Sequence, residues 1–183
     1  TISQKECALD SWGACLILLL SFPSIYRFYP KKRLDARVFR VWYTENMFNI
    51  VGLGNPGKEY ENTRHNTGRE ILKLIAKKPA LRSLGEGGEG FSEWKEDGKS
   101  KALLSAGKMG KNKAQFILPN NMMNNSGGSV LPFIKSKKDL AQLVVIYDDM
   151  DLPTGKIKIS YNRSSGGHRG LESIIKKLKT EEF

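Results

Sequence analysis

The sequence contains only two cysteines among its 183 residues, Cys7 and Cys15. So few cysteines exclude a disulfide-stabilised scaffold. The chain also lacks an apolar run of the ~18 residues that a membrane-spanning helix needs. The longest such run, residues 12–22, is about half that length, and no internal repeat is present. With 39% hydrophobic and 27% charged residues, the composition is that of one globular domain and excludes collagen, coiled coils and wholly disordered chains.

The charge of the chain is strongly unbalanced. Thirty lysines and arginines against nineteen acids give a formal net charge of +11. A basic globular domain often acts on a polyanion, and nucleic acid is the commonest one. A high net charge also keeps proteins in solution, so charge alone leaves both interpretations open.

Residues 1–46 differ from the rest of the chain. They hold both cysteines and two of the three tryptophans, and they show neither helical nor strand periodicity. Charged residues ahead of the apolar run, few serines and several acids are atypical of signal and transit peptides. Met47 is followed at once by an apolar strand pattern. We therefore predict a poorly ordered extension over residues 1–46 and a functional domain over residues 47–183, which contains no cysteine and suits a reducing, cytoplasmic compartment. If residues 1–46 were a transit segment, the compartment would be an organelle.

From Met47 onward, strand and helix patterns alternate. This predicts an α/β fold, a single globular domain with a twisted, mostly parallel or mixed sheet flanked by helices. The expected strands are residues 48–53, 91–94, 102–105, 114–118, 143–147 and 156–161, and the expected helices are residues 67–78, 121–135 and 167–179. Residues 54–66 are expected to form a loop and 85–90 a turn. The domain is expected to lack its C-terminal part, because the chain stops after a helix where a further strand should follow.

Three of these elements carry a more specific prediction. The short apolar run 143–147 is typical of a central strand. Residues 156–161 alternate lysine and isoleucine, which indicates a half-exposed or edge strand. In the helix over residues 121–135, the side chains expected to face inward are Met122, Met123, Val130 and Ile134.

The segment GLGNPG at residues 52–57 follows the first strand and matches the dinucleotide fingerprint G-x-G-x-x-G. That fingerprint requires a helix to open inside the motif, so that backbone amides meet the pyrophosphate. Here Pro56 and Gly57 turn the chain away, and the next helix comes about ten residues later. The motif instead indicates a sharp turn with Asn55 at its tip, at the strand end where α/β proteins build their sites.

A histidine and an aspartate are expected at that same sheet edge. His65 precedes a helix, and a lone histidine is more often structural than catalytic. Asp148 directly follows the strand 143–147, where it could accept the Nδ1 proton of His65 and hold that ring as a base. Asp148, Asp149 and Asp151 could also bind Mg²⁺ or form a solvated turn. Because the domain has no cysteine and no G-x-S-x-G, a water is the simplest nucleophile.

Two further segments are rich in groups that recognise polar ligands. The amides of residues 120–125 exceed what helix capping explains, and they suit a peptide or ester group. The turn SSGGHRG at residues 164–170 precedes a helix and could hold a phosphate, although a flexible linker explains it equally well. Nearby basic side chains favour the anion: Lys156, Lys158, Arg163 and Arg169.

Together these segments resemble the bacterial-type peptidyl-tRNA hydrolase family. The matching motifs, in order, are VGLGNPG at 51–57 with Tyr60 and TRHN at 63–66, MMNNSG at 122–127, DDMDLP at 148–153 and GGHRGL at 166–171. The resemblance covers the chain except residues 1–46. It implies a monomeric, metal-free and cofactor-free α/β esterase that cleaves the bond between a peptide and the 3′ end of tRNA.

The resemblance also implies roles for single residues. His65 would be the general base on water, Asp148 would stabilise its basic form, and Asn55 would help distinguish peptidyl from free aminoacyl esters. The positions expected to contact the substrate or tRNA are Tyr60, Met122, Asn124, His168 and Arg169.

The chain departs from the family pattern at three of its positions. Met122 replaces an aromatic residue, which weakens stacking on the substrate. Arg169 replaces an asparagine and exchanges an amide contact for a cation, and Ser160 stands where the family often has lysine.

Two other classes compete with this hydrolase prediction. One is a non-catalytic RNA-binding relative of the same fold, such as those that act in group II intron splicing. The other is a nucleotide-dependent oxidoreductase, which the missing helix inside GLGNPG disfavours.

Overall fold

The computed structural model describes residues 47–77, 90–110 and 112–183. The predicted extension over residues 1–46 and nearly all of the predicted turn at 85–90 lie outside the described residues.

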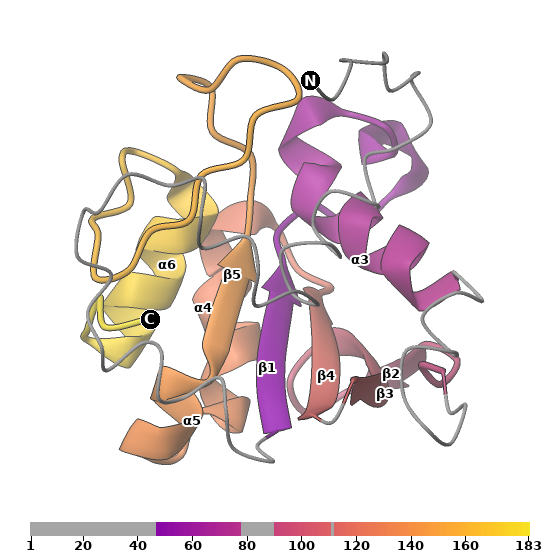
Figure 1. Ribbon diagram of the computed structural model, residues 1–183. Coiled ribbons are helices and arrows are strands. Elements are labelled where there is room, and N and C mark those ends of the chain that lie inside the picture. The colour runs from indigo at the N-terminus through magenta and orange to yellow at the C-terminus, as the bar shows by residue number, and fades with distance from the viewer. Residues whose placement is uncertain (1–46, 78–89, 111) are drawn as a thin grey trace, which may run out of the picture.

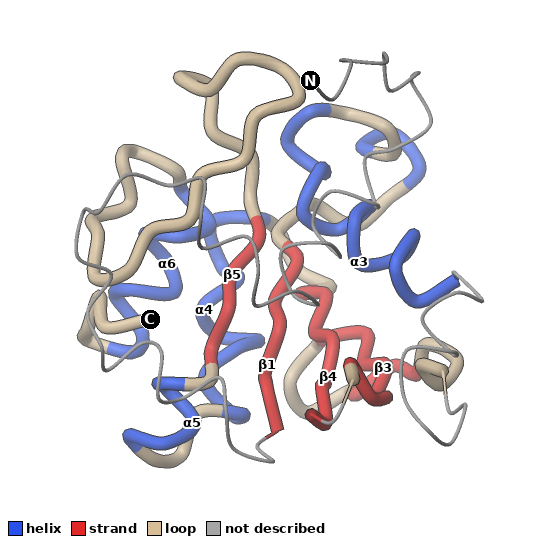
Figure 2. Tube along the Cα trace, viewed as in Figure 1, coloured by secondary structure: helices blue, strands red, loops and turns tan. Residues whose placement is uncertain are grey.

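A five-stranded mixed sheet forms the centre of the fold, with the strand order β2-β3-β4-β1-β5. The three strands β1 (Met47–Gly52), β4 (Asn112–Pro119) and β5 (Leu143–Ile146) are parallel, and β1 lies between the other two. The strands β2 (Lys95–Asp97) and β3 (Ala102–Met109) extend the sheet in antiparallel fashion beyond β4. Figure 2 shows β5, β1 and β4 side by side. The predicted α/β fold with a mixed sheet is confirmed.

Helices cover both faces of the sheet. One face packs on α3 (Thr67–Lys77), and the other packs on α4 (Ser126–Val130) and α6 (Arg169–Leu178), as Figure 1 shows. Alternate residues of β1 point to the two sides, so Phe48 and Ile50 join the core beneath α3 while Val51 joins the core beneath α4 and α6. The remaining elements are α5 (Lys137–Ala141) and the 3₁₀ helices η2 (Lys58–Tyr60), η3 (Arg64–Asn66), η5 (Met123–Asn125) and η6 (Leu131–Phe133). Within the described ranges, no helix has both the length and the apolar character needed to cross a membrane.

The start of α3 approaches β5 closely at Gly68. A Cβ added there would collide with the carbonyl oxygen of Ile146. The Arg69 backbone N–H also donates a hydrogen bond of 2.9 Å to the carbonyl oxygen of Leu53, just after β1. Because Gly68 has no side chain, the helix can begin directly above the carboxyl ends of the parallel strands.

The prediction of a central strand at residues 143–147 is wrong. Among the described residues, β5 lies at one edge of the sheet and pairs only with β1. Its run of apolar residues reflects the helices that cover both faces of the sheet. The sequence pattern cannot distinguish a strand covered on both faces from a strand that is paired along both of its edges.

Two other predicted strands are absent from the described structure. Residues 156–161 pair with no described strand, and Ile159 is 67% exposed. Residues 91–94 run beside β3, but the Ser92 hydroxyl accepts a hydrogen bond from the Ala106 backbone N–H, which breaks the regular ladder. The strand β2 therefore begins only at Lys95.

The predicted helix over residues 121–135 is divided into η5, α4 and η6. Pro132 lies in η6 and lacks the N–H that a continuing helix needs. Met123 and Val130 are buried as expected, and Ile134 packs against the core. Met122 is 48% exposed, so its predicted inward position is wrong.

Candidate active site

The carboxyl ends of the three parallel strands meet at one edge of the sheet. Asn55 follows β1, Met123 follows β4 and Asp148 follows β5. Because β1 lies between its two parallel neighbours, the loop that carries Asn55 and His65 is flanked by the loops from both. This is the edge where the sequence predicted a site.

His65 and Asp148 are in direct contact. The Nδ1 atom of His65 lies 2.8 Å from Oδ1 of Asp148. The side chain of Asp148 is 8% exposed, whereas that of His65 is 45% exposed. The aspartate is thus held inside the fold, while the outer part of the histidine ring is open to solvent.

A second histidine contacts the same carboxylate oxygen. Nε2 of His168 lies 3.2 Å from Oδ1 of Asp148, and this ring is also only 8% exposed. Burial acts to raise the pKa of Asp148, but the hydrogen bonds from His168 and His65 outweigh it and lower that pKa below its ordinary value. The carboxylate is therefore ionised near neutral pH.

The hydrogen bonds of His168 determine where its proton lies. His168 is the N-cap of α6, and its Nδ1 atom accepts a hydrogen bond of 3.2 Å from the backbone N–H of Leu171. A nitrogen that accepts carries no proton, so the proton of the neutral ring is on Nε2 and points at Asp148.

The position of the proton on Nε2 of His168 also affects metal binding. His65, Asp148 and His168 offer ligand atoms within 4.8 Å of one another, which is close enough for a cation. A protonated Nε2 has no lone pair for a metal, so the helix cap of His168 opposes that use. Asp149 is not part of this cluster, and its carboxylate accepts a hydrogen bond from the Asp151 backbone N–H. The geometry favours a hydrogen-bonded network over the Mg²⁺ site that the three acids suggested.

Asn55 is held by a buried partner, Asn66. The side-chain oxygen of Asn66 accepts from the Asn55 backbone N–H at 2.8 Å, and its NH₂ group donates to the Asn55 carbonyl at 2.9 Å. The side-chain oxygen of Asn55 in turn accepts from the Met123 backbone N–H at 2.7 Å. Within the described residues, the Asn55 NH₂ group makes no hydrogen bond, so it is a fixed donor without a partner.

Arg64 ties the loop after β5 to the His65 turn. Its Nη2 atom lies 3.2 Å from the carbonyl oxygen of Asp149, 3.4 Å from that of Met150 and 3.5 Å from that of Leu152. Sequence reasoning did not assign a role to Arg64 or Asn66. The signal was present, because both flank His65 in the TRHN segment.

The remaining predicted contact residues lie on separate elements. Tyr60 is half-buried in η2, Asn124 is exposed in η5 and Arg169 is exposed at the first residue of α6. None of these three side chains hydrogen bonds to another described residue, so they are not joined to the His65 network. Their roles, and that of Met122, stay predictions.

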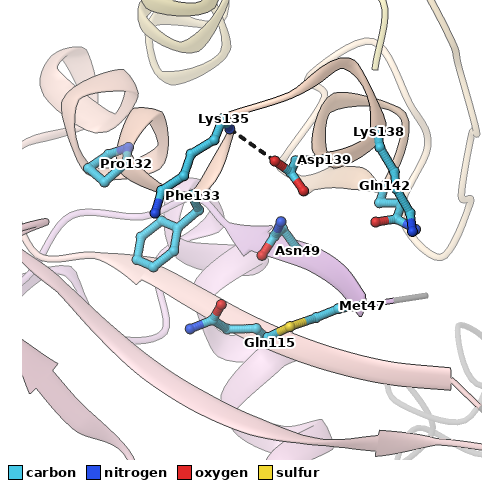
Figure 3. Close-up of a pocket in the computed structure, with 9 residues that line it drawn as sticks. All are labelled: Met47, Asn49, Gln115, Pro132, Phe133, Lys135, Lys138, Asp139 and Gln142. Atoms are coloured by element: carbon cyan, nitrogen blue, oxygen red, sulfur yellow. Dashed lines mark hydrogen bonds between the residues drawn. The ribbon is translucent and has the colours of Figure 1, made fainter. Parts of the chain in front are cut away.

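A cavity of about 360 Å³ lies at the opposite edge of the sheet, near the amino ends of β1 and β5 (Figure 3). Amide side chains of Asn49, Gln115 and Gln142 line it together with two lysines, Lys135 and Lys138. The Nε2 atom of Gln142 is buried without a partner. The cavity contains no residue of the His65 network and is a separate feature.

Comparison with known proteins agrees with the geometry. A family model described as peptidyl-tRNA hydrolase matches residues 49–183. A curated peptidyl-tRNA hydrolase from Prochlorococcus marinus (strain MIT 9312) is 42% identical over 139 residues, which are 75% of this chain and 64% of that protein. One from Carboxydothermus hydrogenoformans is 44% identical over 138 residues, which are 75% of this chain and 67% of that protein.

The solved structures agree as well. The chain is similar to the crystal structure of peptidyl-tRNA hydrolase from Acinetobacter baumannii, with a TM-score of 0.65 and 31% identity. That match covers 77% of this chain and 66% of the other. The chain thus spans about 61–67% of the length of the curated relatives and solved structures it matches.

Proposed function

The chain belongs to the peptidyl-tRNA hydrolase family, and on this premise we propose that it hydrolyses the ester bond of peptidyl-tRNA to release tRNA and peptide. The observation that carries the proposal is the 2.8 Å contact between the half-exposed His65 and the buried Asp148. A histidine oriented by a buried carboxylate is suited to remove a proton from water.

The proposed reaction uses His65 as the general base. With Asp148 ionised, the His65 Nδ1–H donates to it, and the lone pair of the neutral ring is on Nε2. Nε2 removes a proton from a water molecule, whose oxygen attacks the ester carbonyl carbon. The C–O bond to the ribose then breaks, and the protonated His65 returns the proton to the leaving ribose oxygen. An ester needs less leaving-group assistance than an amide, so one acid–base residue can suffice.

Asn55 is proposed to recognise the peptide end of the substrate. Its NH₂ group is fixed in place and has no partner among the described residues. Such a donor can bind a carbonyl oxygen of the peptide, or the oxyanion that develops during attack. Because Asn66 holds the backbone of Asn55 and the Met123 backbone N–H holds its side-chain oxygen, the NH₂ group is oriented before the substrate arrives.

The proposed partner is tRNA, contacted by Tyr60, Met122, Asn124 and Arg169. The net charge of +11 supports a polyanionic substrate, and Arg169 can reach a phosphate from the exposed start of α6. The fifth position expected from sequence, His168, has a ring that is only 8% exposed, which leaves little of it for such a contact.

We also propose that the domain starting at Met47 folds and reacts without residues 1–46. The support is that β1, which begins at Met47, is paired on both sides within the described residues. The proposed domain is a monomer in the cytoplasm, or in an organelle if residues 1–46 act as a transit segment. Deleting residues 1–46 should leave a soluble, active protein that elutes as a monomer, and an insoluble product would contradict the boundary.

The test of the proposed function is hydrolysis of an N-blocked aminoacyl-tRNA by the full chain and by His65→Ala. The substitution should lower kcat by at least ~10²-fold, because the base is lost, while tRNA binding changes little. Glu59→Gln is the matched control, since Glu59 is exposed in the same loop and outside the network. Absence of hydrolysis by the unmodified chain, with RNA binding retained, would replace the proposal with the non-catalytic RNA-binding alternative.

A further inference from the structure

We propose that His168 is a positioning residue that, by holding Asp148, sets which nitrogen of His65 is basic. The inference rests on the proposed function of His65 as the base. It changes the role of His168 from the substrate or tRNA contact expected from sequence to that of a residue that orients the base through Asp148. The observations are two hydrogen bonds, one at each nitrogen of a buried ring.

The first observation is that His168 can act only as a donor toward Asp148. The Leu171 backbone N–H occupies its Nδ1 lone pair, so the ring proton is on Nε2, 3.2 Å from Oδ1 of Asp148. Reversing the tautomer would set two N–H groups against each other at the helix start. The cap of α6 therefore determines the direction of the bond to Asp148.

The second observation is that the ring cannot easily leave this place. It lies 4.9 Å from the ring of Tyr147 and 4.9 Å from the ring of His65, measured between centroids. On another side is Gly170, where an added Cβ would lie 3.1 Å from Cε1 of His168. The ring is enclosed by these neighbours as well as by its two hydrogen bonds.

The consequence for Asp148 is that a single oxygen, Oδ1, receives both histidine protons. The bond from His168 stops the carboxylate from rotating about its χ angles, so Oδ1 stays opposite Nδ1 of His65. That oxygen holds the proton of His65 on Nδ1 and leaves Nε2 free as the base. Without His168, the carboxylate gains rotational freedom, and both tautomers of His65 become populated.

Two substitutions separate the bonds that His168 makes. The Oδ1 atom of an asparagine side chain falls near the place of histidine Nδ1, so His168→Asn keeps an acceptor for the helix cap but cannot reach Asp148. The NH₂ group of a glutamine side chain falls near the place of Nε2, so His168→Gln keeps the donor to Asp148 and loses the cap. Both variants remove the ring, so each is the control for the other.

The experiment measures kcat and KM with an N-blocked aminoacyl-tRNA, the melting temperature, and the ¹⁵N NMR shifts of the His65 ring, which report its tautomer. His168→Asn should melt at a higher temperature than His168→Gln because it keeps the helix cap, and it should lower kcat by about tenfold with KM unchanged and show mixed His65 tautomers. His168→Gln should melt at a lower temperature yet keep kcat within about threefold and keep the Nδ1–H tautomer.

Three outcomes would overturn the inference. Unchanged kcat and tautomer in His168→Asn would show that Asp148 does not need this donor. A kcat loss in His168→Gln as large as in His168→Asn would show that the ring itself, which both variants lack, matters rather than the donor to Asp148. A raised KM with unchanged kcat in both variants would return His168 to substrate contact. If the unmodified chain does not hydrolyse the ester but His168→Asn still mixes the His65 tautomers, the proposed function fails and the positioning role is supported.

Discussion

Replacing Asn66 with aspartate changes one NH₂ group to oxygen and keeps the size of the side chain. The carboxylate can still accept from the Asn55 backbone N–H, but it can no longer donate to the Asn55 carbonyl, which lies 2.9 Å from the present nitrogen. Two oxygen atoms would then face each other at a residue that is 1% exposed. The substitution therefore tests whether the paired amides hold Asn55 in place.

The size of the effect follows from this burial. Leaving a buried carbonyl unpaired costs about 1–3 kcal/mol, and a charged neighbour adds to it. We expect Asn66→Asp to lower the free energy of unfolding by about 2–4 kcal/mol at neutral pH, which is about 4–16 °C in melting temperature. Hydrolysis should also fall, because the Asn55 donor loses its fixed direction.

The pH dependence gives the sharper test. Burial and the facing carbonyl raise the pKa of the introduced carboxyl above the ordinary value of about 4. A protonated carboxyl can donate again, so the deficit relative to the unmodified protein should shrink as pH falls through the raised pKa. Thermal melts of both proteins at several pH values measure this stability deficit. Asn62→Asp is the control, because it makes the same charge change at an exposed residue of the same loop. If both variants melt at the same temperature at neutral pH, the amide pair does not hold Asn55.

Three further changes test other parts of the structure. Asp148→Asn should reduce hydrolysis less than loss of the base does, and the acidic limb of the pH–rate profile should move to lower pH because the imidazolium loses its anionic partner; an unmoved limb would contradict the contact. Gly68→Ala should lower the free energy of unfolding by at least about 2 kcal/mol in urea denaturation, because the added Cβ collides with the Ile146 carbonyl; equal stability would show that α3 can shift. Arg169→Asn should raise KM for tRNA at constant kcat and reduce the salt dependence of binding by about one phosphate contact; a changed kcat with the same salt slope would place Arg169 at the ester.

The elements that were predictable from sequence are those with a strong local pattern. The strand β1 and the helices α3 and α6 show clear apolar periodicity, and each lies within two residues of its predicted bounds. The contact of His65 with Asp148 was also predictable, because residues that follow parallel strands must meet at one edge.

The errors arose where the outcome depends on partners distant in sequence. Residues 156–161 have a strand pattern but no strand beside them within the described part of the chain. Ser92 ends a ladder through its own hydroxyl, which no periodicity reveals. The link from His168 to Asp148 depends on a helix cap and a tautomer, and both are set by the folded structure.

The central place of β1 among its parallel neighbours has a consequence for how activity would appear during folding. The pairing of Asn49 with Leu143 joins segments separated by about half of the chain. Closing so long a loop is slow, because its entropy is lost before the contacts form. The hairpin of β3 and β4 and the helix α3 need only local contacts and can form earlier. Since Asp148 meets His65 only after β5 docks, enzyme activity recovered on refolding should lag behind circular dichroism and report the last pairing of the sheet.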